Sequence, residues 1–240
     1  MDVFGNVKVG VLGGIGPEAT GEFYSKLIMR LQETGYIKNN KDFPQLLVNS
    51  IPAPELIHET VSDSDLAPYV SGLRELDRFG VDFIIMVCNT IHLFYGLLQK
   101  EVNASIIDLR DEVRKAVCDA KIKSVFVLGT PYTVHGGLYR FDGIKSFEPS
   151  EDELQQLARA VFNFNRGVDK KGCIGRVREI CQKYMMLGAE TVIMGCTEFA
   201  VMLGKENISK INSIDVLVSA TINRITGKTS EQKILLKNQT

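Results

Sequence analysis

The chain has 240 residues, of which 45% are hydrophobic and 24% are charged, and its formal net charge at pH 7 is −1. This balance is typical of a globular protein with a sizeable core, and it lacks the basic surface of proteins that bind nucleic acids or anionic membranes. No apolar run reaches the roughly 18 residues that a membrane-spanning helix requires. We therefore expect no nucleic-acid partner, no membrane partner and a cytoplasmic location.

Strands and helices are predicted to alternate in the first half of the chain. Apolar runs predict strands at 7–12, 45–49 and 81–87, and apolar residues at helical spacing predict helices at 17–31 and 65–79. Pro17 stands near the first helical position, where its missing N–H costs nothing. The order β, α, β, α, β predicts a parallel sheet covered by helices on both faces.

The second half continues the alternation. Helices are predicted from 88 toward 99 and at 108–120, 151–164 and 176–187, and strands at 125–128 and in the run that leads to Cys196. A last helix, predicted at 215–225, is expected to return the chain to its first part. We therefore predict two α/β domains, 1–103 with 213–240 and 104–212.

A short phrase occurs twice in the chain. Residues 84–90 read IIMVCNT and residues 192–198 read VIMGCTE, and each run follows a turn that contains glycine. The echo extends upstream, because residues 8–14 (KVGVLGG) resemble residues 124–130 (SVFVLGT). The separation of about a hundred residues exceeds the roughly 20 to 50 of repeat arrays and indicates a duplicated domain. Two like halves that face each other would bring Cys88 and Cys196 to one cleft.

A glycine-rich segment, Gly10–Gly16, joins the first predicted strand to the first helix. Its spacing is not the GxGxxG pattern of dinucleotide-binding proteins, and the second strand ends in Asn49 and Ser50 rather than in an acidic residue. Two interpretations remain. Either Gly13 and Gly14 allow close approach of a small ligand whose carboxylate their N–H groups attract, or the segment is a tight turn without a ligand.

The cysteines divide into two groups. Five is an odd number and the spacing is not that of a zinc site, so neither a disulfide framework nor a metal is expected. Cys118, Cys173 and Cys181 have no context that indicates chemistry. Cys88 and Cys196 stand at the carboxyl ends of predicted strands, where α/β proteins bind ligands, and before helices, whose N-termini lower thiol pKa values.

Two equivalent thiols suit one kind of chemistry. Racemisation or epimerisation removes a proton from one face of a carbon and returns one to the other face, so it needs a base and an acid that exchange roles. A duplicated domain supplies such a pair without a metal.

Four motifs together resemble those of the aspartate/glutamate racemase family, in the expected order and over nearly the whole chain. They are residues 10–20 (GVLGGIGPEAT), 88–92 (CNTIH), 128–134 (LGTPYTV) with 137–139 (GLY), and 195–198 (GCTE). The resemblance implies a cofactor-independent amino-acid racemase with two pseudo-symmetric α/β domains, each a parallel sheet flanked by helices, and an active site in the cleft between them. It further implies a small amino-acid substrate and a homodimer.

The resemblance also implies roles for individual residues. Cys88 and Cys196 would be the catalytic acid/base pair. The substrate-binding site would be lined by Gly14, Ile15, Asn89, Thr90, Thr130, Thr133, Thr197 and Glu198. Glu198 is expected to bond the substrate ammonium, or else to stabilise the N-terminus of its helix. His92 either supports the Cys88 thiolate or is an ordinary helix-face histidine.

The chain departs from the family pattern where the side chain of the substrate would be held. Aspartate-specific members carry Ile-Pro-Asp-Arg, and this chain has Pro54 in place of the arginine; they carry Ile-Lys-x-Gly, and this chain has Asn165 in place of the lysine. A buried carboxylate without a partner costs several kcal/mol. We therefore expect a substrate other than aspartate, unless Arg166, Lys170 or Lys171 takes over, with Asn165 and Arg166 as further candidates for support of the site.

Two alternatives to a racemase stay open. One is an isomerase or decarboxylase of small dicarboxylates that uses a single cysteine, and the presence of both cysteines argues against it. The other is a catalytically lapsed protein that binds an amino acid, as the two missing cations would allow. Solvent deuterium incorporation into a bound amino acid distinguishes an enzyme from such a binding protein.

Overall fold

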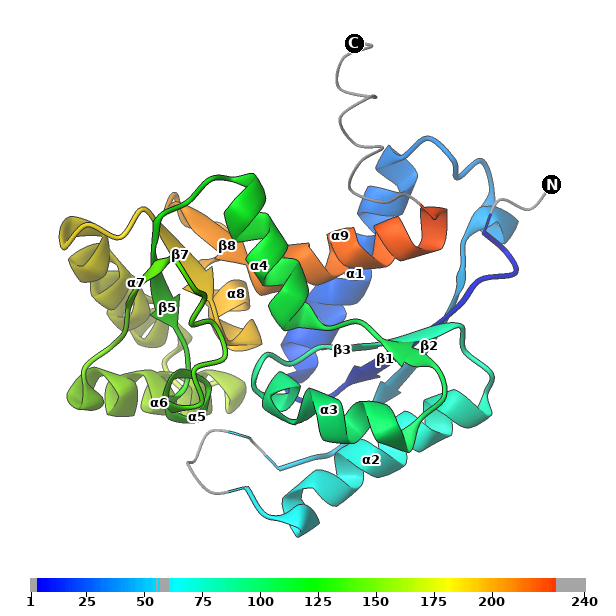
Figure 1. The fold of residues 1–240 in the computed structure, drawn as a ribbon, viewed down its shortest axis with the longest axis horizontal. Helices are drawn as coiled ribbons and strands as arrows, with labels where there is room; N and C mark the ends of the chain where they lie inside the picture. The colour runs from blue at the N-terminus through cyan, green and yellow to red at the C-terminus, as the bar shows by residue number, and fades with distance from the viewer. Residues whose placement is uncertain (1–3, 55, 57–60, 228–240) are drawn as a thin grey trace.

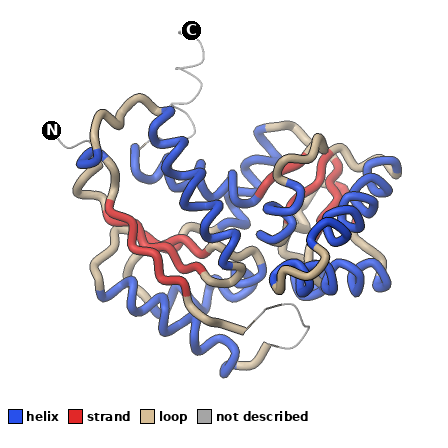
Figure 2. The backbone as a smooth tube through the Cα atoms, turned by 180° about the vertical axis from the view of Figure 1, so that it is seen from behind, coloured by secondary structure: helices blue, strands red, loops and turns tan. Residues whose placement is uncertain are grey.

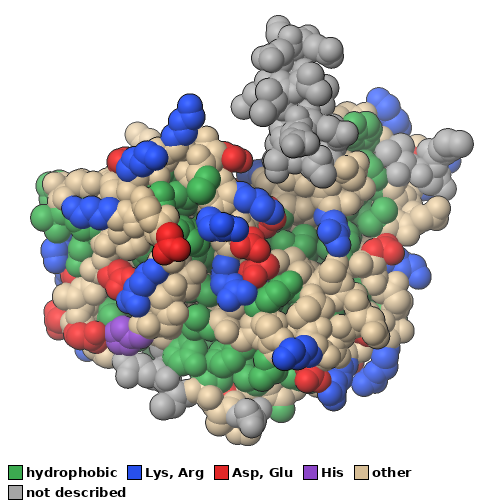
Figure 3. All heavy atoms as spheres, in the orientation of Figure 1, with side chains coloured by type: hydrophobic (Ala, Val, Ile, Leu, Met, Phe, Trp, Pro, Cys, Tyr) green, Lys and Arg blue, Asp and Glu red, His purple; other side chains and the backbone are tan. Residues whose placement is uncertain are grey.

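A computed structural model describes residues 4–54, 56 and 61–227. Two parallel sheets occupy two lobes of the molecule, with helices around each sheet (Figure 1), and the view from behind shows the same separation (Figure 2). Within the described residues no helix has the length and apolar character needed to cross a bilayer. On the face seen in Figure 3, basic and acidic side chains are interspersed, in keeping with a net charge of −1.

The first sheet has the strand order β2-β1-β3-β4, and all its neighbouring strands are parallel. Its strands are β1 (Lys8–Gly13), β2 (Gln45–Ser50), β3 (Phe83–Met86) and β4 (Ser105–Ile106). The elements between them are α1 (Pro17–Glu33), η1 (Asn40–Asp42), α2 (Asp63–Arg78), η2 (Thr90–Phe94), α3 (Tyr95–Leu98) and η3 (Gln99–Glu101).

The second sheet repeats this order as β6-β5-β7-β8, again parallel throughout. Its strands are β5 (Ser124–Leu128), β6 (Lys145–Phe147), β7 (Thr191–Met194) and β8 (Lys210–Asn212). The helices of this half are α4 (Leu109–Asp119), α5 (Pro131–His135), α6 (Glu151–Asn165), α7 (Lys170–Met186), α8 (Thr197–Leu203) and α9 (Ser213–Thr226). The predicted fold of two similar α/β halves with parallel sheets is confirmed.

The predicted elements agree with the structure best where the chain is buried. Strands β3, β5 and β7 have no exposed residue, because helices cover both faces of their sheets, and such strands read as continuous apolar runs. Sequence patterns missed α5, β6 and β8, which are too short to show a period. The helix predicted from 88 toward 99 is instead a chain of short turns, η2, α3 and η3.

Helix α9 links the two halves. It packs along α1 and against α4, and Figure 1 shows it extending from the second sheet toward the first lobe. Asp215 of α9 pairs with Lys26 at 3.0 Å and with Arg30 at 3.1 Å on α1. The division of the chain at 103 and 213 stays a prediction. Strand β4 pairs with β3 just beyond the expected boundary at 103, so the first sheet extends to Ile106, and 228–240 lies outside the described residues.

The turn after β1 requires glycine. Gly14 has φ +88°, and a Cβ on it would lie 2.3 Å from the carbonyl oxygen of Ile51, where the segment after β2 passes. Gly35 also has a positive φ, +74°, but no atom lies within 4 Å of the place that its Cβ would take. Substitutions at Gly14 and Gly35 therefore separate the free-energy cost of backbone strain from that of steric overlap.

Gly14→Ala is expected to lower the free energy of unfolding by more than about 2 kcal/mol, because the strain of a positive φ and the overlap with Ile51 act together. Gly35→Ala serves as the control and should lose only about 1 kcal/mol through strain alone. Urea unfolding followed by circular dichroism measures both values. Equal losses in the two variants would contradict the proposed close packing of Gly14.

Candidate functional site

A cavity of about 270 Å³ lies between the two sheets, beyond the carboxyl ends of their strands. In parallel α/β sheets this is the edge at which ligands bind. The volume suits one small molecule of amino-acid size. Its lining residues are Gly14, Ile15, Gly16, Pro17, Ala53, Leu56, Cys88, Asn89, Thr90, Thr130, Val161, Asn165, Arg166, Cys196, Thr197 and Glu198.

Most of the predicted site residues line this cavity, and two lie behind it. Thr133 is buried, with its hydroxyl 2.8 Å from that of Thr90 and 3.2 Å from that of Thr130. His92 is also buried, with Nδ1 at 2.8 Å from the carbonyl oxygen of Cys88. Both residues therefore support the lining instead of forming it.

The lining contains residues that the sequence analysis did not select. Gly16 and Pro17 fall within the first motif, and Ala53 falls within the segment that departs from the family pattern. Leu56 and Val161 gave no signal, because one apolar residue in a loop and one on a helix resemble any core residue.

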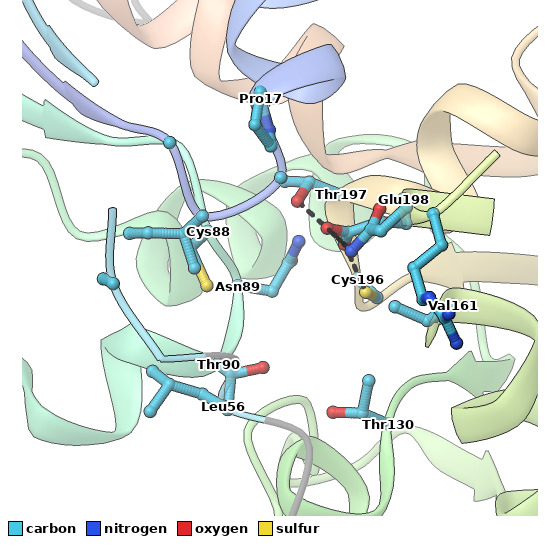
Figure 4. A pocket seen from close by; sticks show the side chains of 16 residues that line it. Pro17, Leu56, Cys88, Asn89, Thr90, Thr130, Val161, Cys196, Thr197 and Glu198 are labelled. Carbon is cyan, nitrogen blue, oxygen red and sulfur yellow. Dashed lines mark hydrogen bonds between the residues drawn. The ribbon is translucent and has the colours of Figure 1, made fainter. Parts of the chain in front are cut away.

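Cys88 and Cys196 occupy equivalent positions on the two sides of the cavity. Cys88 follows β3, and Cys196 follows β7 and caps α8. Figure 4 shows the two side chains on opposite sides of the pocket with their sulfur atoms directed into the space between them. Both are free thiols, and each has 7% or less of its surface exposed.

Burial dominates the acidity of both thiols. It raises the pKa of Cys88 to about 12, although the amide groups of Ile91 and Thr90 and the Thr90 hydroxyl favour the thiolate. Burial, followed by the charge of Glu198, raises the pKa of Cys196 well above its usual value. The expected lowering of the two thiol pKa values by helix N-termini is therefore wrong. The turn after Cys88 is a short 3-10 helix, and desolvation outweighs what its amides contribute.

Glu198 contacts the thiol of Cys196 directly. The Cys196 Sγ donates to Oε2 of Glu198 at 2.8 Å, and the Thr197 hydroxyl donates to the same oxygen at 3.3 Å. The amide of Asn165 lies 3.5 Å from the other oxygen, Oε1. Burial raises the pKa of Glu198 above its usual range, which makes this carboxylate a stronger base. It is placed to accept the proton of the Cys196 thiol.

The sequence left two interpretations of the glycine turn open, and the structure bears on the N–H group of Gly14. The N–H of Gly14 donates to the Thr20 hydroxyl at 3.0 Å and is therefore engaged within the turn. Gly14 is glycine because of its φ and its contact with Ile51. The tight-turn interpretation holds for this N–H group.

The side-chain end of the pocket carries little positive charge. Among the described lining residues Arg166 is the only cation, and its guanidinium stacks on Phe162 at 5.1 Å from the ring centroid. Lys170 pairs with Glu18, and the carbonyl of Pro54 accepts the Tyr69 hydroxyl. Neither position at which aspartate-specific proteins carry a cation supplies one here.

The acidity of the two pocket thiols is tested by alkylation of the protein without added amino acid. Iodoacetamide near pH 8.5 should modify exposed Cys118 at least about tenfold faster than Cys88 or Cys196, because both pocket thiols are buried and have raised pKa values. Peptide mass spectrometry measures each rate, and the rate at Cys88 should keep rising with pH above this point. Faster modification of Cys88 than of Cys118 at neutral pH would contradict the raised pKa.

Comparisons with known proteins agree on one family. The model of the family described as Asp/Glu/Hydantoin racemase matches residues 12–221. The chain is 29% identical over 219 residues to a protein of Bacillus subtilis (strain 168) named broad specificity amino-acid racemase RacX. The matched region covers 89% of this chain and 96% of that protein.

Solved structures of similar proteins share the fold. An aspartate racemase homologue from Pyrococcus horikoshii OT3 has a TM-score of 0.68 and 25% identity, covering 91% of this chain and 99% of that chain. The aspartate racemase of Picrophilus torridus has a TM-score of 0.75 and 24% identity, covering 92% of this chain and 94% of that chain. The chain therefore belongs to the Asp/Glu/Hydantoin racemase family, whose named racemases are isomerases.

Proposed function

We propose that the protein is a cofactor-independent amino-acid racemase in which Cys88 and Cys196 work as a thiolate and thiol pair on opposite faces of the α-carbon. One observation carries the proposal. Two buried thiols face each other across a cavity of amino-acid size, at corresponding strand ends of two like sheets. Family membership supports it.

The reaction moves one proton at each thiol. The thiolate on one side takes the α-proton, the electron pair of the broken C–H bond spreads into the α-carboxylate, and the opposite thiol gives its proton to the other face. The two sulfurs end with exchanged protonation states, so the reverse reaction uses the same groups. Asn89, Thr90 and Thr197 supply polar groups at the pocket wall for the carboxylate.

Substrate binding offsets the cost of forming a thiolate in this pocket. The ammonium group of an amino acid brings a positive charge beside the two sulfurs and Glu198, and a nearby opposite charge lowers the pKa of an acid. Glu198 accepts a hydrogen bond from the Cys196 thiol. We propose that it takes part in forming that thiolate and then faces the ammonium.

The substrate side chain is neutral in this proposal. Ala53, Leu56 and Val161 give the lining an apolar component, and Pro54 and Asn165 leave the positions of the two carboxylate-binding cations neutral. An aspartate side chain would there lose its hydration without gaining an ion pair. The name of the Bacillus subtilis relative, a broad specificity racemase, fits a pocket without such an anchor.

The single-cysteine alternatives receive less support, because both thiols line the same cavity. A lapsed amino-acid-binding protein is separated from an enzyme by the experiments below. The homodimer and the cytoplasmic location rest on the sequence analysis alone and stay predictions.

Cys88→Ala and Cys196→Ala should each lower racemisation by at least about a thousandfold, because each removes the thiol that serves one face of the α-carbon. Each variant can still exchange the α-proton of one enantiomer with deuterium, and the two should prefer opposite enantiomers. Chiral chromatography and NMR in heavy water give both rates. Cys118→Ala, a cysteine outside the pocket, is the control. Near-normal turnover in both pocket variants would eliminate the two-thiol mechanism.

Aspartate should be a poor substrate of the natural protein compared with amino acids that have neutral side chains, as kcat/KM across a panel will show. Asn165→Lys places a cation in the lining and should raise kcat/KM for aspartate by about tenfold or more, since a charge-assisted hydrogen bond contributes about 1.5 to 3 kcal/mol. Asn163→Lys on the same helix is the control, because Asn163 does not line the pocket. Aspartate as the best natural substrate would contradict this specificity, and Arg166 would then be the first residue to substitute.

A further inference from the structure

Tyr139 lies between the two turns that carry the catalytic thiols. Its hydroxyl donates to Oδ1 of Asn89 at 2.5 Å, and Asn89 is the residue directly after Cys88. A Cβ placed on Gly195 would lie 3.4 Å from Cδ2 and Cε2 of the Tyr139 ring, so the ring packs on the backbone directly before Cys196. One side chain therefore contacts both cysteine turns.

The amide of Asn89 is held from both of its ends. Its oxygen accepts the Tyr139 hydroxyl, and its nitrogen donates to the Ser213 hydroxyl at 3.0 Å, where α9 begins. The two hydrogen bonds together fix the plane of the amide. The nitrogen carries a second hydrogen, and Asn89 lines the pocket between Cys88 and Cys196 (Figure 4). That hydrogen is available to an oxygen of a bound ligand.

Tyr139 keeps its proton at any working pH. It is 1% exposed, and burial raises its pKa well above the usual value, with the charges of Cys88 and Cys196 acting in the same direction. The hydroxyl therefore always has a hydrogen to donate. While it donates to Oδ1, the Asn89 nitrogen lies at the opposite end of the amide, toward Ser213.

We propose that Tyr139 is a positioning residue with two roles, one for its hydroxyl and one for its ring. Its hydroxyl keeps an Asn89 N–H turned toward the α-carboxylate of the substrate, and its ring holds the turns of Cys88 and Cys196 at one separation. This inference rests on the proposed racemase function, and it assigns to a residue outside the pocket lining the geometry of the groups that touch the substrate.

The hydroxyl is tested with Tyr139→Phe, which keeps the ring. Losing a buried hydrogen bond that orients Asn89 should raise KM for the best amino acid of the panel by about tenfold to a hundredfold, with a much smaller change in kcat. In the Asn89→Ala background the same substitution should have little further effect on KM, because the two residues act through one contact. Tyr184→Phe is the control, since its hydroxyl bonds Glu153 and its ring stacks on Phe126, away from the pocket. An unchanged KM in Tyr139→Phe would overturn the assignment, and so would an equally large rise in KM when the substitution is made in the Asn89→Ala background.

The ring is tested with Tyr139→Leu in heavy water. A loosened separation should uncouple the two thiols, so that deuterium enters recovered substrate without inversion more often than in the natural protein. Tyr139→Phe should keep the natural ratio of exchange to inversion. An unchanged ratio in Tyr139→Leu would remove the spacing role.

A readout that needs no catalysis separates this inference from the proposed function. The signals of the Asn89 side-chain hydrogen that bonds Ser213, assigned by their absence in Asn89→Ala, should exchange slowly with solvent in the natural protein and faster in Tyr139→Phe, where the amide is held at one end only. If they do so while the natural protein inverts no amino acid, the racemase proposal fails and the positioning of Asn89 stands. If the natural protein is active and the amide exchange is unaltered, the positioning inference is overturned.

Discussion

Desolvation of two facing thiols is the constraint on which this site depends. Each thiol follows a central strand of its own sheet and is buried, and the cavity between them is lined by residues from both halves of the chain. Bulk water therefore does not solvate a thiolate at either position. Burial penalises the thiolate at both positions. Both thiols are therefore weak acids, and a cationic ligand beside them would favour ionisation of one.

The rest of the architecture keeps that arrangement rigid. Threonine hydroxyls bridge the halves at Thr90 and Thr133, the Tyr139 side chain spans the two cysteine turns, and ion pairs join α9 to α1. A hydrophobic cluster runs from the first half into the second and includes Cys196, whereas Cys88 belongs to a smaller cluster on the α2 side of the first sheet. The cavity between these clusters is where their packing stops.

Sequence reasoning succeeded where a signal was periodic or repeated. The buried strands, the amphipathic helices and the duplicated cysteine phrase are local patterns, and they were enough to predict the fold class and a cleft that holds both cysteines. Most of the other lining residues followed from the resemblance to the aspartate/glutamate racemase family. Pairings between distant segments carry no local pattern. Tyr139 bonds a residue fifty positions away, Gly14 packs against the carbonyl of Ile51, and the depth at which Cys88 is buried raises its pKa. Leu56 and Val161 join the pocket only through the way the chain folds.

One measurement tests the central claim most directly. A single protiated enantiomer of an accepted amino acid is incubated with the natural protein in heavy water, and the deuterium content of both enantiomers is followed at early times. Two thiols that act on opposite faces predict deuterium at the α-carbon of the newly formed antipode, while the remaining substrate keeps its protium. Equal labelling of both enantiomers from the first turnovers would show that one base serves both faces, and it would contradict the account.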